Sequence, residues 1–183
     1  MGRSLVLATV GLLVISIAAG CGGDDSDGGG GFERFEEDGL AVEYPSPWTV
    51  DEEKEGGEAG TVISVHAAPG EDGLFPRLSV GRQDREFRDA PQAGGVMATE
   101  RPFQLHEGRL VSDGRTKVPG SEGAWRVETR FQIRSDRGGT TPGRAVEVIA
   151  LKGDDQVILT LAGPADVMER LPVDRIVGSL DLH

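Results

Sequence analysis

The stretch AWRVETRFQIR, residues 124–134, alternates between two kinds of side chain without a break. Every second position carries a mostly apolar group: Trp125, Val127, Thr129, Phe131 and Ile133. The positions between them are charged or polar. Because successive side chains of a strand point to opposite faces of its sheet, this pattern predicts a strand with one buried and one solvated face. A sheet with one wet face favours antiparallel pairing.

Shorter alternating segments surround this strand and predict more of the same sheet. Residues 40–44, 61–67 and 78–80 each place apolar side chains on one face, with Ile63 and Val65 inward in the second of them. Residues 144–152 and 156–162 are separated by Gly153-Asp154-Asp155, which is typical of a hairpin.

Helical patterns are fewer. The segment 91–101 is a candidate helix, although it contains Gly94-Gly95. In the segment 173–180 the apolar residues fall at the spacing of one helix face. Residues 165–171 form a turn or two before Pro172. The sequence therefore predicts a single α+β domain over residues 32–183, an antiparallel sheet with helices packed on one face.

The N-terminal residues 1–20 have the pattern of a targeting segment. The apolar run 5–19 has about 15 residues, shorter than the roughly 20 that a membrane-spanning helix needs. The sequence Ala18-Ala19-Gly20-Cys21 follows and holds the only cysteine of the chain. This resembles a bacterial lipoprotein signal peptide. The resemblance implies cleavage after Gly20, diacylglycerol on the Cys21 thiol and a fatty acid such as palmitate on the new N-terminus, placing the protein on the extracytoplasmic side of the cell membrane.

Two other interpretations of residues 1–20 remain open at this point. One is an uncleaved anchor helix. The other is cleavage by ordinary signal peptidase, which would release a protein with a free thiol.

Residues 21–31 are mostly glycine and aspartate with almost nothing to bury, which predicts a flexible tether. Asp25, Asp27, Gly30 and Glu36 match four positions of a calcium-binding loop. The fifth loop position is Gly29, which has no side-chain ligand, and no helix can precede Asp25. We therefore predict no metal site.

Charge excludes one class of partner. The formal net charge is −12, and residues 22–58 hold thirteen acidic against two basic residues. The rest of the domain is nearly neutral and has no clustered basic surface. Binding to nucleic acid needs such a surface, so none is expected.

No pattern of catalytic residues stands out. The three histidines, His66, His106 and His183, lack the neighbours of known hydrolase or metalloprotease motifs, and there is no phosphate-binding loop. We therefore expect a protein that is not an enzyme and that needs no cofactor.

The chain contains two further short motifs, Gly39-Leu-Ala-Val-Glu-Tyr-Pro-Ser-Pro-Trp48 and Ile176-Val-Gly-Ser179-Leu180. They resemble motifs of the PsbP-like family, which includes the extrinsic lumenal protein of photosystem II and actinobacterial lipoproteins of the LpqN type. The resemblance implies a sheet-and-helix sandwich and a non-catalytic assembly or binding accessory at a membrane.

We therefore predict that the chain binds or helps to assemble another protein of the cell envelope, in an oligomeric state left open. The alternative is a carrier of a lipid or other small apolar ligand, held in a groove between sheet and helices. Tyr44, Trp48 and Trp125 are the candidate groove residues, although large aromatic side chains more often pack in a core.

Overall fold

The computed structural model describes residues 31–51, 60–134 and 138–183. The predicted signal peptide and lipidation site, including Gly20 and Cys21, and all but the last residue of the tether lie outside the described residues. No helix in the described ranges is long and apolar enough to cross a membrane.

Ten strands and three helices follow one another along the described chain. Their bounds are β1 Phe32–Glu37, β2 Leu40–Pro45, β3 Thr49–Val50, β4 Thr61–His66, β5 Arg77–Asp84, α1 Ala90–Gln104, β6 Arg109–Thr116, β7 Gly123–Arg134, β8 Thr140–Lys152, β9 Asp155–Pro164, α2 Ala165–Met168, α3 Val173–Gly178 and β10 Asp181–Leu182.

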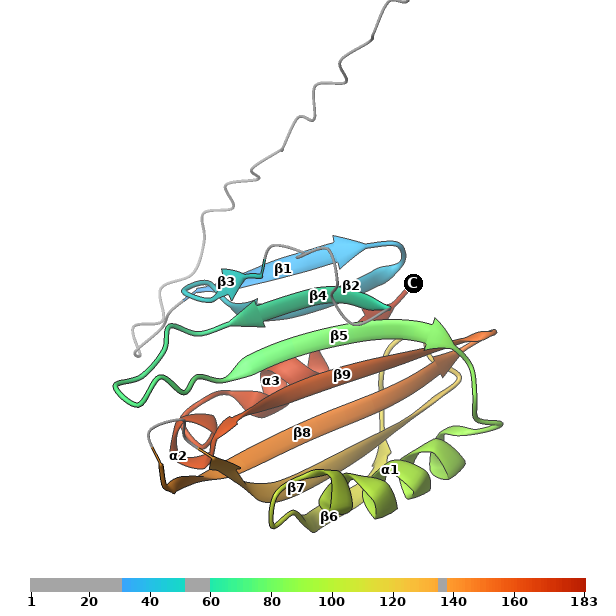
Figure 1. The fold of residues 1–183 in the computed structure, drawn as a ribbon. Helices are drawn as coiled ribbons and strands as arrows, with labels where there is room; N and C mark the ends of the chain where they lie inside the picture. Colours follow the sequence, from blue (N-terminus) through green and yellow to red (C-terminus); the bar gives the residue numbers. More distant parts are fainter. Residues whose placement is uncertain (1–30, 52–59, 135–137) are drawn as a thin grey trace, which may run out of the picture.

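The strands form a large and a small sheet, and every pairing is antiparallel (Figure 1). The large sheet has the order β3-β4-β5-β9-β8-β7-β6, and the small one has the order β1-β2-β10. The predicted hairpin is formed by β8 and β9, and Gly153 between them adopts a positive φ of 56°. The predicted α+β fold with an antiparallel sheet is confirmed.

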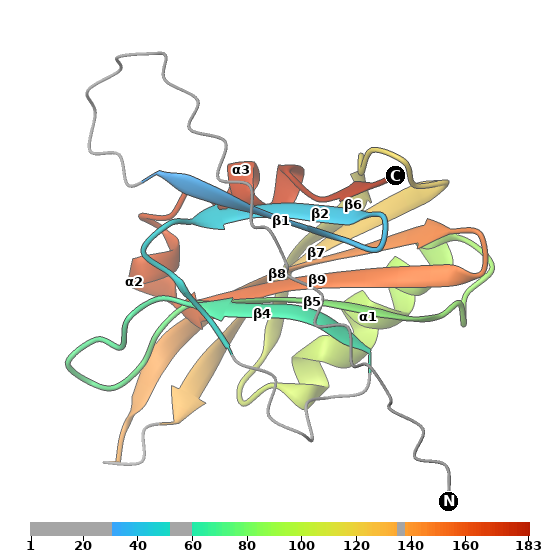
Figure 2. The ribbon, with the colours of Figure 1, turned by 90° about the horizontal axis from the view of Figure 1, so that it is seen from above.

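The main core lies on one face of the large sheet, which we call the inner face. Leu78, Val80, Val148, Leu159 and Leu161 point into it and are completely buried. The small sheet and the helices α2 and α3 cover this face, as Figure 2 shows. Most of the apolar burial that stabilises the fold is therefore on this side.

The two family-like motifs meet in this layer. Ser179, at the end of α3, accepts a hydrogen bond from the backbone N–H of Glu43 in β2 at 2.8 Å and donates one to the carbonyl of Ile176. The N–H of His183 donates to the carbonyl of Gly39, whose φ of +73° suits glycine. The C-terminus is thus fastened to the first motif.

The other face of the large sheet, which we call the outer face, is covered by α1 over β6, β7 and β8. A smaller apolar cluster forms there around Ala90, Ala93, Ile149 and Leu151. Helices were predicted on one face, and the structure has them on both. The reason is that β8 is apolar on both faces, so that it needs cover on each side.

Candidate binding site

The predicted groove residues lie in two separate places. Tyr44 and Trp48 are buried in the inner core, where the Tyr44 hydroxyl donates to Glu33 at 3.1 Å. Burial, followed by this bond to Glu33, raises the pKa of Tyr44. Trp125 lies on the outer face against α1. The structure therefore does not bring the three aromatic residues into one groove.

Trp125 instead supports α1, which packs directly on its indole ring. A Cβ added at Gly94 would come within 2.0 Å of the indole ring, so the helix backbone rests directly on the aromatic side chain. The indole N–H donates to Asp113 of β6 at 3.1 Å. The predicted apolar face of β7 is thus covered, but by α1 rather than by the main core.

Local sequence explains where α1 begins. Asp89 is its N-cap and accepts a hydrogen bond from the N–H of Gln92 at 2.9 Å, while Pro91 occupies the first turn, where no N–H is needed. The bond from Gln92, followed by the nearby Arg88, lowers the pKa of Asp89.

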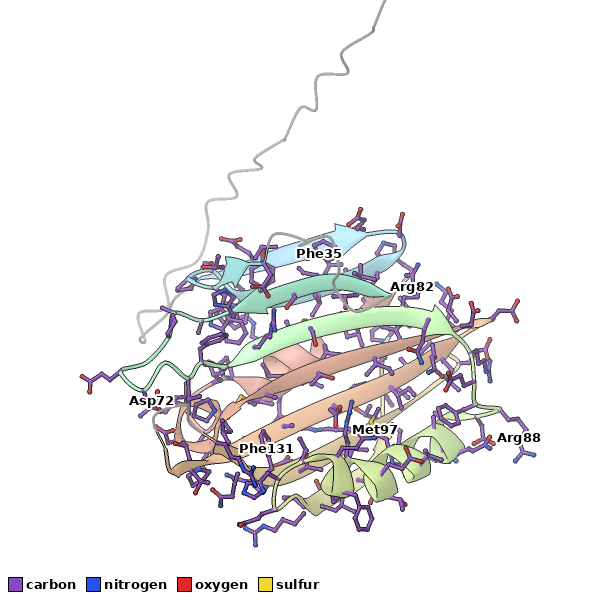
Figure 3. All side chains as sticks on the ribbon, in the orientation of Figure 1. Phe35, Asp72, Arg82, Arg88, Met97 and Phe131 are labelled. Atoms are coloured by element: carbon purple, nitrogen blue, oxygen red, sulfur yellow. The ribbon has the colours of Figure 1, made fainter. Side chains whose placement is uncertain are left out.

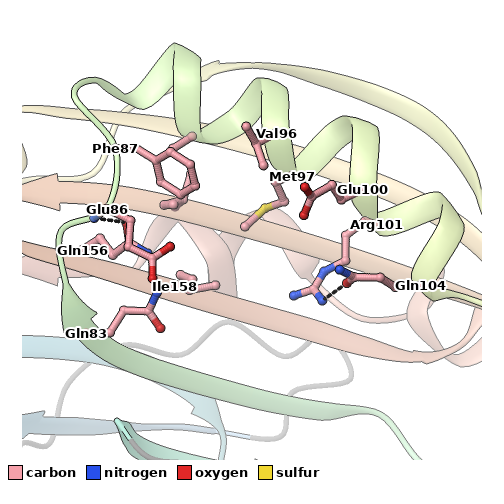
Figure 4. Close-up of a pocket in the computed structure, with 12 residues that line it drawn as sticks. Gln83, Glu86, Phe87, Val96, Met97, Glu100, Arg101, Gln104, Gln156 and Ile158 are labelled. Atoms are coloured by element: carbon pink, nitrogen blue, oxygen red, sulfur yellow. Dashed lines mark hydrogen bonds between the residues drawn. The ribbon is translucent and has the colours of Figure 1, made fainter.

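A hollow of about 170 Å³ lies beside α1, between the helix and the outer face of β5, β8 and β9 (Figure 4). It exists because α1 covers only the β6–β8 side of the sheet. Apolar side chains supply half of the lining: Phe87, Ala93, Val96, Met97, Ile149 and Ile158. Polar side chains supply the other half: Gln83, Glu86, Glu100, Arg101, Gln104 and Gln156. Met97 reaches from α1 over the sheet on the same face as Phe131 (Figure 3).

The positive charge at the hollow is already balanced. Arg101 donates to Glu147 at 2.7 Å and to Gln104 at 2.8 Å. Glu147 is 2% exposed, and its second oxygen has no hydrogen-bond partner among the described residues. Arg101 therefore serves mainly to neutralise a buried carboxylate.

Three other polar groups of the hollow are less well paired: the carboxylates of Glu86 and Glu100 and the side-chain nitrogen of Gln156. Neither Glu86 nor Glu100 has a basic group within ion-pair distance in the part of the chain that the structure describes. Gln156 is 1% exposed, and its Oε1 accepts a hydrogen bond from the N–H of Glu86 at 3.3 Å. Its Nε2 donates to no described residue. Sequence analysis missed this site, because its residues are scattered from 83 to 158.

Exposed large apolar side chains occur mainly on α1 and on the strand that follows it. Among the described residues, four large apolar side chains are exposed, and three of them belong to α1 and β6: Phe103, Leu110 and Val111. Phe103 is 87% exposed. We call these three residues and the hollow the α1 surface.

The histidines do not assemble a reactive site. His66 lies 3.3 Å from Asp51, whose carboxylate also binds Ser64 and Arg77 at the sheet margin. No group of three potential metal ligands occurs among the residues with described positions.

Comparison with solved structures identifies the fold. The cyanobacterial PsbP protein CyanoP of Synechocystis superposes with a TM-score of 0.61 at 15% identity, covering 91% of this chain and 99% of that one. The chain has the PsbP-like fold. LpqN of Mycobacterium tuberculosis, described as involved in cell envelope biogenesis, gives 0.55 at 11% identity, with 78% and 82% covered.

A third similar structure is the Ran-binding protein Mog1p of Saccharomyces cerevisiae, with a TM-score of 0.56, 10% identity and coverage of 84% and 96%. No family model and no curated protein sequence matches the chain. At these identities the likeness concerns the fold, and the function has to be argued from the residues of this chain.

Proposed function

We propose that this protein is a non-catalytic accessory of the cell envelope, anchored through a lipid on Cys21, which binds another envelope protein through the α1 surface. The observation that carries the proposal is that Phe103, Leu110 and Val111, three of the four exposed large apolar side chains among the described residues, belong to two elements that pack together, α1 and β6. Clustered exposed apolar side chains on a soluble domain are typical of sites that bind other proteins.

The position of the N-terminus supports the choice of surface. Phe32 begins β1 in the small sheet, on the opposite side of the large sheet from α1 (Figure 2). Ten residues separate Cys21 from Phe32, and a glycine-rich segment of that length has a mean reach of roughly 17 Å. An anchor at Cys21 would hold the small sheet toward the membrane and leave the α1 surface facing away from it.

The size of the hollow favours a protein partner over the carrier alternative. Pockets that enclose small organic ligands usually measure about 300–1,000 Å³. The hollow beside α1 measures about 170 Å³ and is open to solvent, which suits side chains of a partner better than a whole acyl chain.

The similar structures add support of a weaker kind. LpqN is tied by its description to cell envelope biogenesis and shares the fold. An envelope role for this chain also agrees with its Ala18-Ala19-Gly20-Cys21 sequence.

Photo-crosslinking in the native host tests the proposal. Benzoylphenylalanine replaces Phe103 in the full-length protein, and a matched variant carries it at Glu37, which is exposed in β1. We expect a discrete protein adduct from position 103 and none from position 37. The same adduct from both positions, or none from either, would rule out the α1 surface as the contact.

The anchor is tested separately. Cys21→Ala should shift the protein from the membrane fraction to the medium or to unprocessed precursor. A wild-type mature N-terminus without lipid mass would show that the anchoring half of the proposal is wrong.

A further inference from the structure

We propose that the hollow beside α1 binds an extended basic segment of the partner, with an apolar side chain in the middle and a lysine or arginine on either side. This inference rests on the proposed function and specifies the chemistry of the partner.

The first argument is charge complementarity. Glu86 and Glu100 are exposed carboxylates on the wall of the hollow, and neither has a basic partner among the described residues. The one basic group there, Arg101, is balanced by Glu147. The hollow therefore presents net negative charge, which attracts cationic side chains and disfavours acidic ones.

The second argument is the distribution of groups along the hollow. Figure 4 shows Glu86 and Gln156 toward one end and Arg101 and Gln104 toward the other, with Glu100 beside Met97 on α1 and Ile158 on the sheet. An extended peptide places side chains i, i+2 and i+4 on one face, about 13 Å from first to last. In the pattern basic-x-apolar-x-basic, one basic side chain would lie at Glu86, the apolar side chain over Met97 and Ile158, and the second basic side chain at Glu100.

The third argument is an unused donor. Gln156 is almost completely buried and lines the hollow, yet its Nε2 donates to no described residue. This Nε2 is not among the sealed, unpartnered polar atoms of the described residues, so it remains free to donate to a main-chain carbonyl of a bound segment. A peptide offers such a carbonyl acceptor, whereas a free small cation does not.

The test uses defined peptides and nuclear magnetic resonance of the soluble domain, residues 22–183, after the described part has been shown to be folded by its dispersed amide spectrum. The probe is acetyl-Lys-Ser-Leu-Ser-Lys-amide, and the matched controls are acetyl-Glu-Ser-Leu-Ser-Glu-amide and acetyl-Lys-Ser-Asn-Ser-Lys-amide. We expect saturable shifts of the Met97 methyl and the Gln156 side-chain amide with the first peptide. The acidic peptide should leave them unmoved, and the asparagine peptide should bind more weakly.

Variants locate the binding. Glu86→Gln and Glu100→Gln should each lower the affinity for the lysine peptide about two- to five-fold, the range for exposed ion pairs. The control Glu37→Gln, in the small sheet on the opposite side, should change nothing. All three replace an exposed carboxylate by its neutral isostere, so a loss of folding should not confuse the comparison.

The outcomes separate this inference from the proposed function. Equal binding of the acidic peptide, or unchanged affinity for the lysine peptide in both Glu86→Gln and Glu100→Gln, would show that the hollow does not recognise a basic segment. If the crosslink from position 103 still forms in that case, the protein-binding function stands with a different contact. If no crosslink forms from position 103 while the lysine peptide binds the hollow, the proposed contact with an envelope protein is wrong and the peptide-binding site is still supported.

Discussion

The two faces of the large sheet are built in different ways. The inner face buries large aliphatic side chains under the small sheet, α2 and α3. The outer face carries a smaller apolar cluster, with Ile149, Leu151 and Trp125, together with an ion pair to the buried Glu147, and α1 covers only part of it. The comparison separates the two tasks of the domain: the inner face holds the fold together, whereas the outer face keeps a hollow and exposed apolar groups available.

The largest effect should come from two neighbouring residues of β9 that point to opposite faces. Leu159 is completely buried in the inner core, whereas Ile158 is half-buried at the hollow. We expect Leu159→Ala to lower the free energy of unfolding by about 3–5 kcal/mol and Ile158→Ala by about 1–2 kcal/mol. Urea melts measure both, and equal losses would show that the outer face is as important for stability as the inner one.

The buried ion pair should matter more than its position on the outer face suggests. Arg101→Met leaves the Glu147 carboxylate buried without a positive partner, which should cost about 3 kcal/mol. Adding Glu147→Gln should restore most of that loss, so chemical denaturation of both single variants and the double variant completes a cycle. The control Arg88→Met removes a largely exposed arginine beside Asp89 and should change stability by less than about 0.5 kcal/mol.

Two adjacent glycines of α1 should respond with opposite signs. Gly94→Ala drives a methyl group into the Trp125 ring and should cost about 1–3 kcal/mol. Gly95 faces open space, so Gly95→Ala should stabilise the helix by about 0.5–1 kcal/mol. Thermal unfolding of the two variants measures the difference. A neutral Gly94→Ala would mean that α1 does not rest on Trp125.

The smallest effect concerns acid stability at the margin of the outer face. Partial burial by itself raises the pKa of Asp51, but hydrogen bonds from Ser64 and Arg77 outweigh it, and the net pKa is lowered from 3.8. A lowered folded-state pKa gives stability that is present above pH 3.8 and is lost as the pH falls through the folded value.

Wild type should therefore exceed Asp51→Asn in stability, by less than about 1 kcal/mol, at pH 6 and lose that advantage below pH 3.8. Melting curves recorded between pH 2.5 and pH 6, in steps of about half a pH unit, check the prediction. Glu71→Gln, which replaces an exposed carboxylate, is the control. A stability advantage of the wild type that grows toward acid pH would contradict a lowered pKa of Asp51.

Alternation allowed most of the large sheet to be predicted from the sequence, because a half-buried strand leaves a period of two in the residues. Ile63, Val65, Leu78 and Val80 point inward as expected. Among the longer strands, those that left no such signal are β1, with two phenylalanines three positions apart, and β6, an exposed edge strand with a shifted register near Leu110. Neither strand buries a regular face of its own.

The sequence by itself determined the α+β class and the β8–β9 hairpin, and it predicts that Cys21 carries a lipid; the Asp89 cap of α1 is a local signal of the same kind, which the sequence analysis missed. These follow from local patterns, since a strand face, a turn or a cap depends on a few consecutive residues. Only the tertiary structure decided which face α1 covers, that Trp125 supports this helix, and that Glu86, Glu100 and Gln156 share one hollow. The physical reason is that alternation identifies two faces of a strand but not what packs on each, and residues 86 and 156 become neighbours only when β5 pairs with β9.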